Sequence, residues 1–354
     1  MMNKLDIYIG KHVLGAILVV MLIVVGLDLL FSLIDELDSV NERYDLFEVV
    51  IYLAMTTPRR LYEFLPLSCL VGCLVGLGML ASHSELTVMR AAGVSTRRIV
   101  GGVMKPVLVL VIGALLLGEF VVPQTEQVAQ SRRALVQSGG EALKSRHGVW
   151  HREGDTFIHI NAVQPDGRVF GVTRYRVDGA RDLQSASYAR EGKFRDGAWQ
   201  LSEISETLFH GDRTEVVHRQ SEVWHSGLTP TLLSVVVVEP VDLSISGLRA
   251  FSQYLAEQGL DNVSYQLAFW KKLLQPLGIL ALVLIGISFI FGPLRSVTVG
   301  QRLIVGIMVG LVFKFAQDML GPASSVYGFT PLLAVLLPIV VCFLVGGWML
   351  KRAK

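Results

Sequence analysis

The sequence predicts an α-helical integral membrane protein with six spanning helices and an inserted all-β domain. Of its 354 residues 52% are hydrophobic and 18% are charged, and the mean hydropathy is +0.51. This composition is too apolar for a soluble globular protein. Six long apolar runs are split three and three by one hydrophilic block, residues 123–272. We therefore expect membrane regions at 1–122 and 273–354, with the block between them folded outside the membrane.

The first apolar run, Val13–Ile34, is interrupted only by Asp28. As a helix it would be roughly 33 Å long, enough to cross a bilayer. The run is longer than a signal-peptide core and no small-x-small cleavage site follows it, which favours an uncleaved span. An acidic loop comes next, and then residues 46–57, which predict an amphipathic helix lying at the membrane interface.

The other spans are predicted at 61–81, 103–122, 273–291, 303–320 and 331–349. Six spans place both termini on the same side. Among the short loops and chain ends, those on that side carry more of the lysines and arginines than those opposite, although Arg59, Arg60, Lys271 and Lys272 fall on the opposite side. Because positive loops stay in the cytoplasm, we expect an inner-membrane protein with cytoplasmic termini and a periplasmic insert.

The hydrophilic block begins helically, with residues 124–135 extending the third span. From Gly148 onward, β-rich segments at 156–160, 169–177 and 213–218 alternate with turn signals at 165–167, 178–179, 195–197 and 210–212. This pattern is typical of a sandwich, barrel or jelly roll. A further strand is predicted at Leu232–Val238. Helical segments at 247–258 and 265–274 lead back to the membrane.

The loop between the second and third spans, residues 82–93, carries signals for a short helix. Ser82 and Glu85 fit a capping box, and Gly93 suits the left-handed position just past a helix end, so we predict a helix of about ten residues. In that helix Glu85 and Met89 would share one face. The segment is either an ordinary polar turn or a handle on which a cytoplasmic motor pulls.

No motif for catalysis, metal binding or cofactor binding is found in the sequence. The P-loop pattern G-x-x-x-x-G-K-[ST] is absent, as are G-x-S-x-G, H-E-x-x-H and paired C-x-x-C. The three cysteines lie inside apolar runs, and His147 and His151 have no acidic or cysteine cluster beside them. An enzyme is therefore the least favoured class. The lack of a strong internal repeat also weakens a secondary-transporter interpretation.

Several short segments, in this order among six spans, resemble the LptF/LptG permease family of lipopolysaccharide-transport ABC exporters, and the LptG branch more than the LptF branch. The segments that carry the resemblance are Gly76–Ala81 running into Ser84-Glu85-Leu86 and Met89, Leu243–Leu248, Gln275-Pro276-Leu277, Ser288–Ser296, Gly321-Pro322 and Val326-Tyr327-Gly328. Together they cover nearly the whole chain.

The resemblance implies a transport subunit with a periplasmic jelly roll that pairs with an LptF-like permease, an LptB-like ATPase dimer and a single-span LptC-like protein. Such a complex extracts lipopolysaccharide from the inner membrane and passes it to a periplasmic bridge toward the outer membrane. Residues 82–93 match the family's coupling helix, so the resemblance implies ATPase contacts at Glu85, Leu86, Met89 and Arg90. The alternative for Glu85 is that it only caps its own helix. The alternative for the whole chain is a membrane scaffold or mechanotransmitter that transports nothing through its own helices.

For the lipid cavity, the candidates on spans one and five are Asp28, Phe31, Lys314, Phe315, Gln317 and Asp318. Ionisable residues inside spans usually face a bundle interior, a cavity or each other. Lys314 therefore either faces headgroup phosphates or forms a local pair with Asp318, four residues on. Some members of the family carry lysines near the outer end of span one that could meet the lipid's phosphates, but here that region contains the acidic stretch 35–38. Arg43, Arg59 and Arg60 are the substitute headgroup candidates, alongside Lys314, the LptF-like partner and bridging divalent cations.

Overall fold

The computed structural model describes residues 4–40, 44–138, 149–163, 168–178, 182–210, 213–228, 230, 240–257, 262–292 and 297–352. The chain divides into two compact units. The helical unit comprises Met1–Leu30, Thr57–Val121 and Ser244–Lys354, and the sheet unit comprises Phe31–Thr56 and Val122–Leu243. The predicted strand Leu232–Val238 lies outside the described residues.

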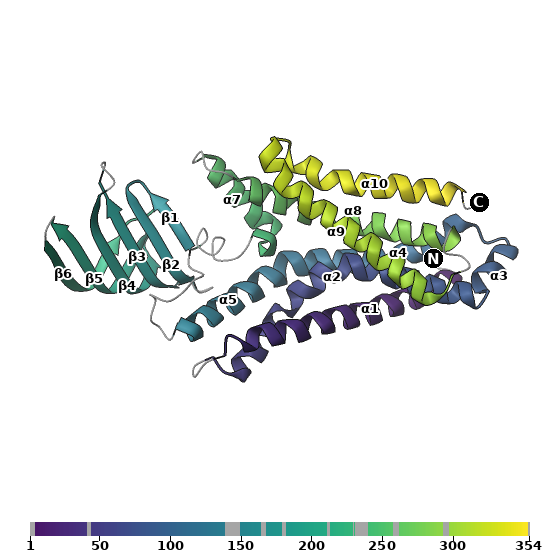
Figure 1. Cartoon of the computed structure of the whole chain (residues 1–354), viewed down its shortest axis with the longest axis horizontal. Coiled ribbons are helices and arrows are strands. Elements are labelled where there is room, and N and C mark those ends of the chain that lie inside the picture. The colour runs from purple at the N-terminus through teal and green to yellow at the C-terminus, as the bar shows by residue number, and fades with distance from the viewer. Residues whose placement is uncertain are drawn as a thin grey trace. The chain divides into compact units, whose positions relative to one another are not determined.

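Within the described residues, six helical stretches are long and apolar enough to cross a membrane, as predicted. The long helices lie alongside one another (Figure 1). They are α1 (Lys4–Leu37), α2 (Leu46–Ser82), α4 (Thr96–Leu116) with its continuation into α5 (Val122–Ser138), α8 (Val263–Phe291), α9 (Val299–Tyr327) and α10 (Pro331–Arg352). The short α3 (Glu85–Ala91) joins α2 to α4, and α7 (Ile245–Glu257) precedes α8.

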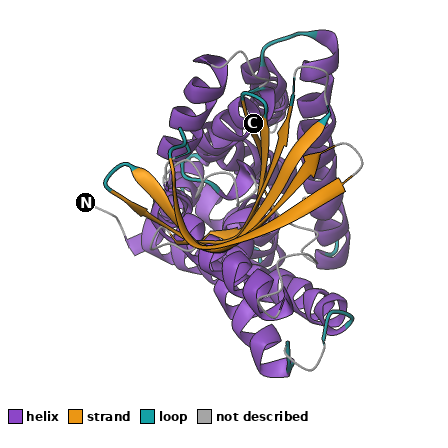
Figure 2. Ribbon diagram, turned by 90° about the vertical axis from the view of Figure 1, so that its left-hand side faces the viewer, coloured by secondary structure: helices purple, strands orange, loops and turns teal. Residues whose placement is uncertain are grey.

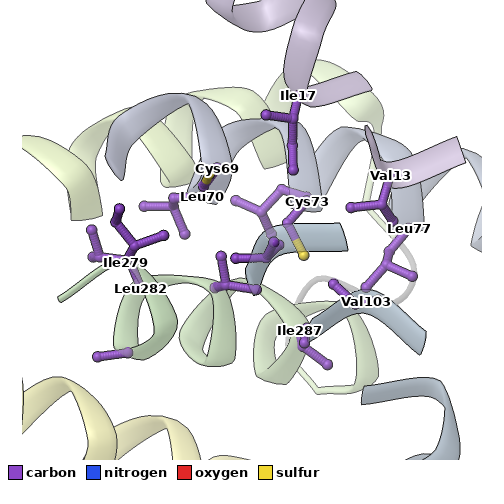
Figure 3. Packing of buried hydrophobic residues seen from close by; sticks show 14 of the residues in the cluster. Val13, Ile17, Cys69, Leu70, Cys73, Leu77, Val103, Ile279, Leu282 and Ile287 are labelled. Atoms are coloured by element: carbon purple, nitrogen blue, oxygen red, sulfur yellow. The ribbon is translucent and has the colours of Figure 1, made fainter. Parts of the chain in front are cut away.

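Most of the core of the helical unit is built from α1, α2, α4 and α8 (Figure 3), with further buried residues from α3, α9 and α10. Helix α1 contributes one buried stripe at four-residue spacing, and much of the rest of its apolar surface is exposed. The buried stripe consists of Ile9, Val13, Ile17, Met21 and Val25. Apolar side chains on the outside of such a bundle suit lipid or partner helices, so the pattern agrees with a membrane span.

The predicted interfacial helix at 46–57 is wrong as a separate element, because α2 runs without a break from Leu46 to Ser82. Pro58 and Pro66 lie inside it. A proline removes one backbone donor, and a long packed helix accommodates that loss. The low hydropathy at Arg59 and Arg60 therefore does not mark the end of a helix.

A π-helix, Leu117–Val121, joins α4 to α5. Glu119 lies at the centre of this π-helix. Its carboxylate accepts hydrogen bonds from Ile245 N at 2.7 Å and Ser246 Oγ at 2.7 Å, at the start of α7. The buried Lys272 of α8 donates to the Gly118 carbonyl at 3.3 Å. The widened turn is therefore fixed by two neighbouring helices, and single π turns of this kind often mark functional sites.

The sheet unit confirms the predicted inserted all-β domain. Its described strands form one six-stranded antiparallel sheet in sequence order, bent into an open trough (Figure 2). The strands are β1 (Val149–Glu153), β2 (Thr156–Val163), β3 (Arg168–Val177), β4 (Leu183–Arg195), β5 (Ala198–His210) and β6 (Arg213–Trp224). The predicted turn at 195–197 is confirmed, with Asp196 at φ 52° and Gly197 at φ 80°, as a tight hairpin requires.

Two clusters hold the sheet unit together. One face of the sheet buries Trp199 among aliphatic side chains, and its indole N–H donates to the Leu228 carbonyl at 2.7 Å. Among the helical segments of the same unit, the Tyr44 hydroxyl donates to Glu36 of α1 at 2.9 Å, and Arg133 of α5 pairs with the same carboxylate at 2.8 Å. Burial, together with the bond to Glu36, raises the pKa of Tyr44.

Candidate functional site

Helix α3 lies at the end of the helical unit where α1 begins and α10 ends (Figure 1). Its first turn differs from the prediction. Ser84 adopts φ +61° before the helix, no side chain of the described residues caps the helix start, and the Ser82 hydroxyl donates back to the Met79 carbonyl at 2.9 Å. The predicted capping box is therefore wrong. The left-handed position of Gly93 is confirmed at φ +86°.

The carboxylate of Glu85 is bound from another helix. The Tyr8 hydroxyl of α1 donates to Glu85 Oε2 at 2.8 Å, across 77 positions of sequence. The interpretation that Glu85 only caps its own helix is also wrong, because its carboxylate accepts a hydrogen bond from Tyr8 of α1. No sequence signal links the two residues, since a lone tyrosine near the N-terminus of a span has many possible uses.

The other residues predicted on α3 divide by burial. Leu86 is 4% exposed and belongs to the core of the helical unit, so it does not lie on the surface that a partner would meet. Met89 is half-buried and packs against the same core. Arg90 is exposed, with its guanidinium 5.9 Å from the ring centre of Phe291 at the end of α8. Leu86 and Met89 therefore attach α3 to its own bundle.

The outward face of α3 differs from the face that sequence reasoning proposed. Ser84, Thr87, Val88 and Ala91 are exposed, and Val88 is exposed to 66%. Their spacing of three and four residues places them on one stripe. Because Leu86 and Met89 pack against the core, the outward stripe is centred on Val88 and not on Met89. Glu85 is half-buried beside this stripe.

A second group of charged residues links neighbouring helices of the helical unit. We call it the charged belt, and its members are Asp28, Arg60, Glu63, Lys271, Lys314 and Asp318. Each member forms an ion pair across helices. Arg60 pairs with Asp28, Lys314 Nζ lies 2.9 Å from Glu63 Oε1, and Lys271 Nζ lies 3.0 Å from Asp318 Oδ1. The alternative of a local pair between Lys314 and Asp318 is therefore wrong, since each pairs with a different neighbouring helix.

Burial separates these pairs. The Arg60 and Asp28 side chains are 8% and 31% exposed, whereas those of Lys314 and Glu63 are 54% and 45% exposed. Lys271 and Asp318 are intermediate, at 29% and 49%. Glu63 and Lys271 were not singled out from the sequence, where they are ordinary charges at the ends of spans.

The remaining lipid-cavity and headgroup candidates are scattered. Phe31 is 66% exposed and Phe315, next to Lys314, is 61% exposed. Gln317 and Arg59 are half-buried. Arg43 lies outside the described residues. The structure thus brings together Asp28, Lys314 and Asp318 in the charged belt and leaves the aromatic candidates on the apolar exterior of their helices.

Comparison with known proteins identifies the family. A family model described as "Lipopolysaccharide export system permease LptF/LptG" matches residues 7–352. The chain is 36% identical to the Lipopolysaccharide export system permease protein LptG of Haemophilus influenzae over 357 residues, covering 100% of both chains. It is 38% identical to the protein of the same name in Escherichia coli K12 over 352 residues, covering 98% of both. The chain belongs to the LptF/LptG family of lipopolysaccharide export permeases and is a multi-pass protein of the inner membrane.

Proposed function

We propose that this chain is the LptG-type subunit of a lipopolysaccharide exporter. It pairs with an LptF-like permease, an LptB-like ATPase dimer and a single-span LptC-like protein, extracts lipopolysaccharide from the inner membrane and passes it to a periplasmic bridge. The observation that carries the proposal is the similarity to LptG proteins over essentially the full length of both chains. ATP hydrolysis is assigned to the partner because the sequence contains no P-loop motif.

Helix α3 is proposed as the element that couples the motor to the permease. A seven-residue helix is too short to be stable alone, and here Leu86 fixes it to the bundle. A force applied to its outward stripe would then move the ends of α2 and α4 directly. Val88 offers an exposed apolar contact for a groove of the ATPase, and Glu85 and Arg90 offer charges on either side of it.

The lipid headgroup is proposed to meet the exposed ion pairs of the charged belt. Exposed pairs contribute little stability, so a phosphate can compete with Glu63 for Lys314 and with Asp318 for Lys271. Lysine binds phosphate as a point charge and does not need a fixed orientation. Phe315, next to Lys314, would face the acyl chains.

Photocrosslinking tests transport against the scaffold alternative. A photoreactive amino acid at Phe315 should yield adducts with lipopolysaccharide in the assembled exporter. The same probe at Leu344, an apolar residue of α10 exposed to 67%, is the control and should react with ordinary phospholipid. Absence of lipopolysaccharide adducts at Phe315 from an exporter that assembles and hydrolyses ATP normally would favour the scaffold.

The proposed orientation has both termini in the cytoplasm and the sheet unit in the periplasm. Lys4, Lys11, Arg97, Arg98 and Arg352 lie on the side assigned to the cytoplasm. A cysteine introduced at Asp166 should react with an impermeant maleimide in intact spheroplasts, and a cysteine at Lys354 should react only after lysis. The native cysteines are buried or half-buried within helices, so their background should be low. The reverse labelling pattern would overturn the orientation.

A further inference from the structure

The first turns of α1 form a fixed base against α4. The Asp6 carboxylate accepts a hydrogen bond from Lys105 Nζ at 2.6 Å and lies 3.6 Å from Arg98 Nε. Ile9 is 1% exposed. At Gly10 an added Cβ would lie 3.6 Å from the Gly102 carbonyl oxygen, in ordinary van der Waals contact, so α1 packs directly on α4 there. The start of α1 is thus held by charge and by packing.

Tyr8 reaches from this base to the coupling helix. Its hydroxyl binds Glu85 Oε2, and its ring packs against the ring of His12, one turn further along α1, with centres 4.3 Å apart. The phenol is therefore supported from the side. Glu85, in contrast, is the first residue of a short helix, where a glutamate side chain would otherwise move among many rotamers.

We propose that Tyr8 is a positioning residue for Glu85, which holds the carboxylate ready for a cationic side chain of the ATPase. The inference rests on the coupling role proposed for α3. The tyrosine engages one carboxylate oxygen, and the other can accept hydrogen bonds from an arginine or lysine. Because the side chain is ordered before the ATPase binds, the entropy cost of ordering it is not added to association.

This arrangement also fixes α3 at both ends. Tyr8 of α1 holds Glu85 at its start, and Phe291 of α8 lies beside Arg90 near its end. Between them Leu86 is buried in the core. Motion of the ATPase would then reach α1 and α8 as well as the adjoining α2 and α4.

A double-mutant cycle tests the proposal. The chain is purified with its LptF-like partner, and the dissociation constant of the cognate ATPase subunit is measured for wild type, Tyr8→Phe, Glu85→Gln and the double variant. Ordering one side chain corresponds to about three- to tenfold in affinity, which is the loss expected for Tyr8→Phe. In the Glu85→Gln background, Tyr8→Phe should cause less than about a twofold further loss, because the two residues act as one unit.

Tyr44→Phe is the matched control. It removes another hydrogen bond from a tyrosine to a glutamate, 2.9 Å long, in the sheet unit. It should leave ATPase affinity unchanged. The thermal unfolding midpoint of Tyr8→Phe should also match wild type, since the bond is exposed. A purely structural role for Tyr8 would lower this midpoint and would not depend on the residue at position 85.

The outcomes separate the inference from the proposed function. If Glu85→Gln binds the ATPase as wild type does, the coupling contact of Glu85 is wrong and the positioning role fails with it. If Glu85→Gln weakens binding while Tyr8→Phe does not, or if the two losses are additive, only the positioning role is overturned. Tighter binding by Tyr8→Phe would also overturn it, because Tyr8 would then be a competitor of the ATPase for Glu85.

Discussion

Helices α1 and α2 meet through their backbones at two glycines one turn apart. A Cβ added at Gly72 would lie 2.4 Å from the Cα of Ile17, and one added at Gly76 would lie 2.9 Å from the Cα of Val13. These contacts are backbone atoms, so no side-chain rotation can relieve them. We predict that Gly72→Ala forces the two helices apart by about 1 Å, with the cost of an overpacked core, about 1–3 kcal/mol.

The assay is thermal unfolding of the permease pair in detergent. Because association of helices in membranes depends on close packing, the unfolding midpoint of Gly72→Ala should fall by on the order of 5 °C. Gly26→Ala on α1 and Gly113→Ala on α4 are matched controls, since an added Cβ there meets nothing within 4 Å. A midpoint for Gly72→Ala equal to that of the controls would refute the close packing of α1 on α2.

Three further predictions concern other sites. Lys314→Asp places a second carboxylate beside Glu63 and should impair lipopolysaccharide transport while the exporter still assembles; normal growth and an intact outer-membrane barrier in cells that depend on the variant would contradict this. Glu119→Gln weakens the cap of α7 by about 1 kcal/mol, so amide hydrogen exchange at Ser246 should accelerate on the order of fivefold, and unchanged exchange would argue against the cap. Burial lowers the pKa of His159 below its usual 6.5, so as the pH falls below that value the unfolded chain takes up the proton more readily and the sheet unit loses stability. His159→Gln should therefore narrow the difference in unfolding midpoint between pH 7.5 and pH 5. An unchanged difference would show that this histidine is not a source of the pH dependence.

The six spans and the inserted β domain could be predicted because both depend on composition and short-range pattern. The strands that the sequence analysis did not predict, β1, β4 and β5, show the limit of this approach. In β4, Ser185, Ser187 and Ala189 are buried at every second position, but small and polar side chains conceal the alternation from a search for apolar residues. The full extent of α2 was missed for a related reason. Hydropathy indicates whether a segment lies in an apolar or a polar environment, whereas backbone hydrogen bonds determine where a helix ends.

The candidate site was predicted less well because its partners come from distant parts of the chain. Lys314 and Asp318 are four residues apart, a spacing that suits a local pair. Carboxylate and ammonium groups on α2 and α8 bind them instead, and sequence spacing cannot report which neighbouring helix supplies a charge. The face of α3 was misassigned because the sequence does not show which side of so short a helix packs on the bundle, and the structure buries Leu86 and half-buries Glu85 and Met89.

On the proposal that the charged belt meets a lipid headgroup, burial separates its members. Removing one partner of a buried ion pair costs about 3–5 kcal/mol, so Arg60, with a side chain only 8% exposed, is better suited to holding α2 against α1 through Asp28 than to binding phosphate. An exposed pair contributes about 0–1 kcal/mol, so a phosphate can replace Glu63 at Lys314 at little cost to the fold. On the proposed function, ion pairs of the same chemistry would serve two purposes, one where α2 meets α1 and the other where α2 meets α9. On this argument the headgroup candidates narrow to Lys314 and Lys271, and charge alone could not have distinguished them from Arg60.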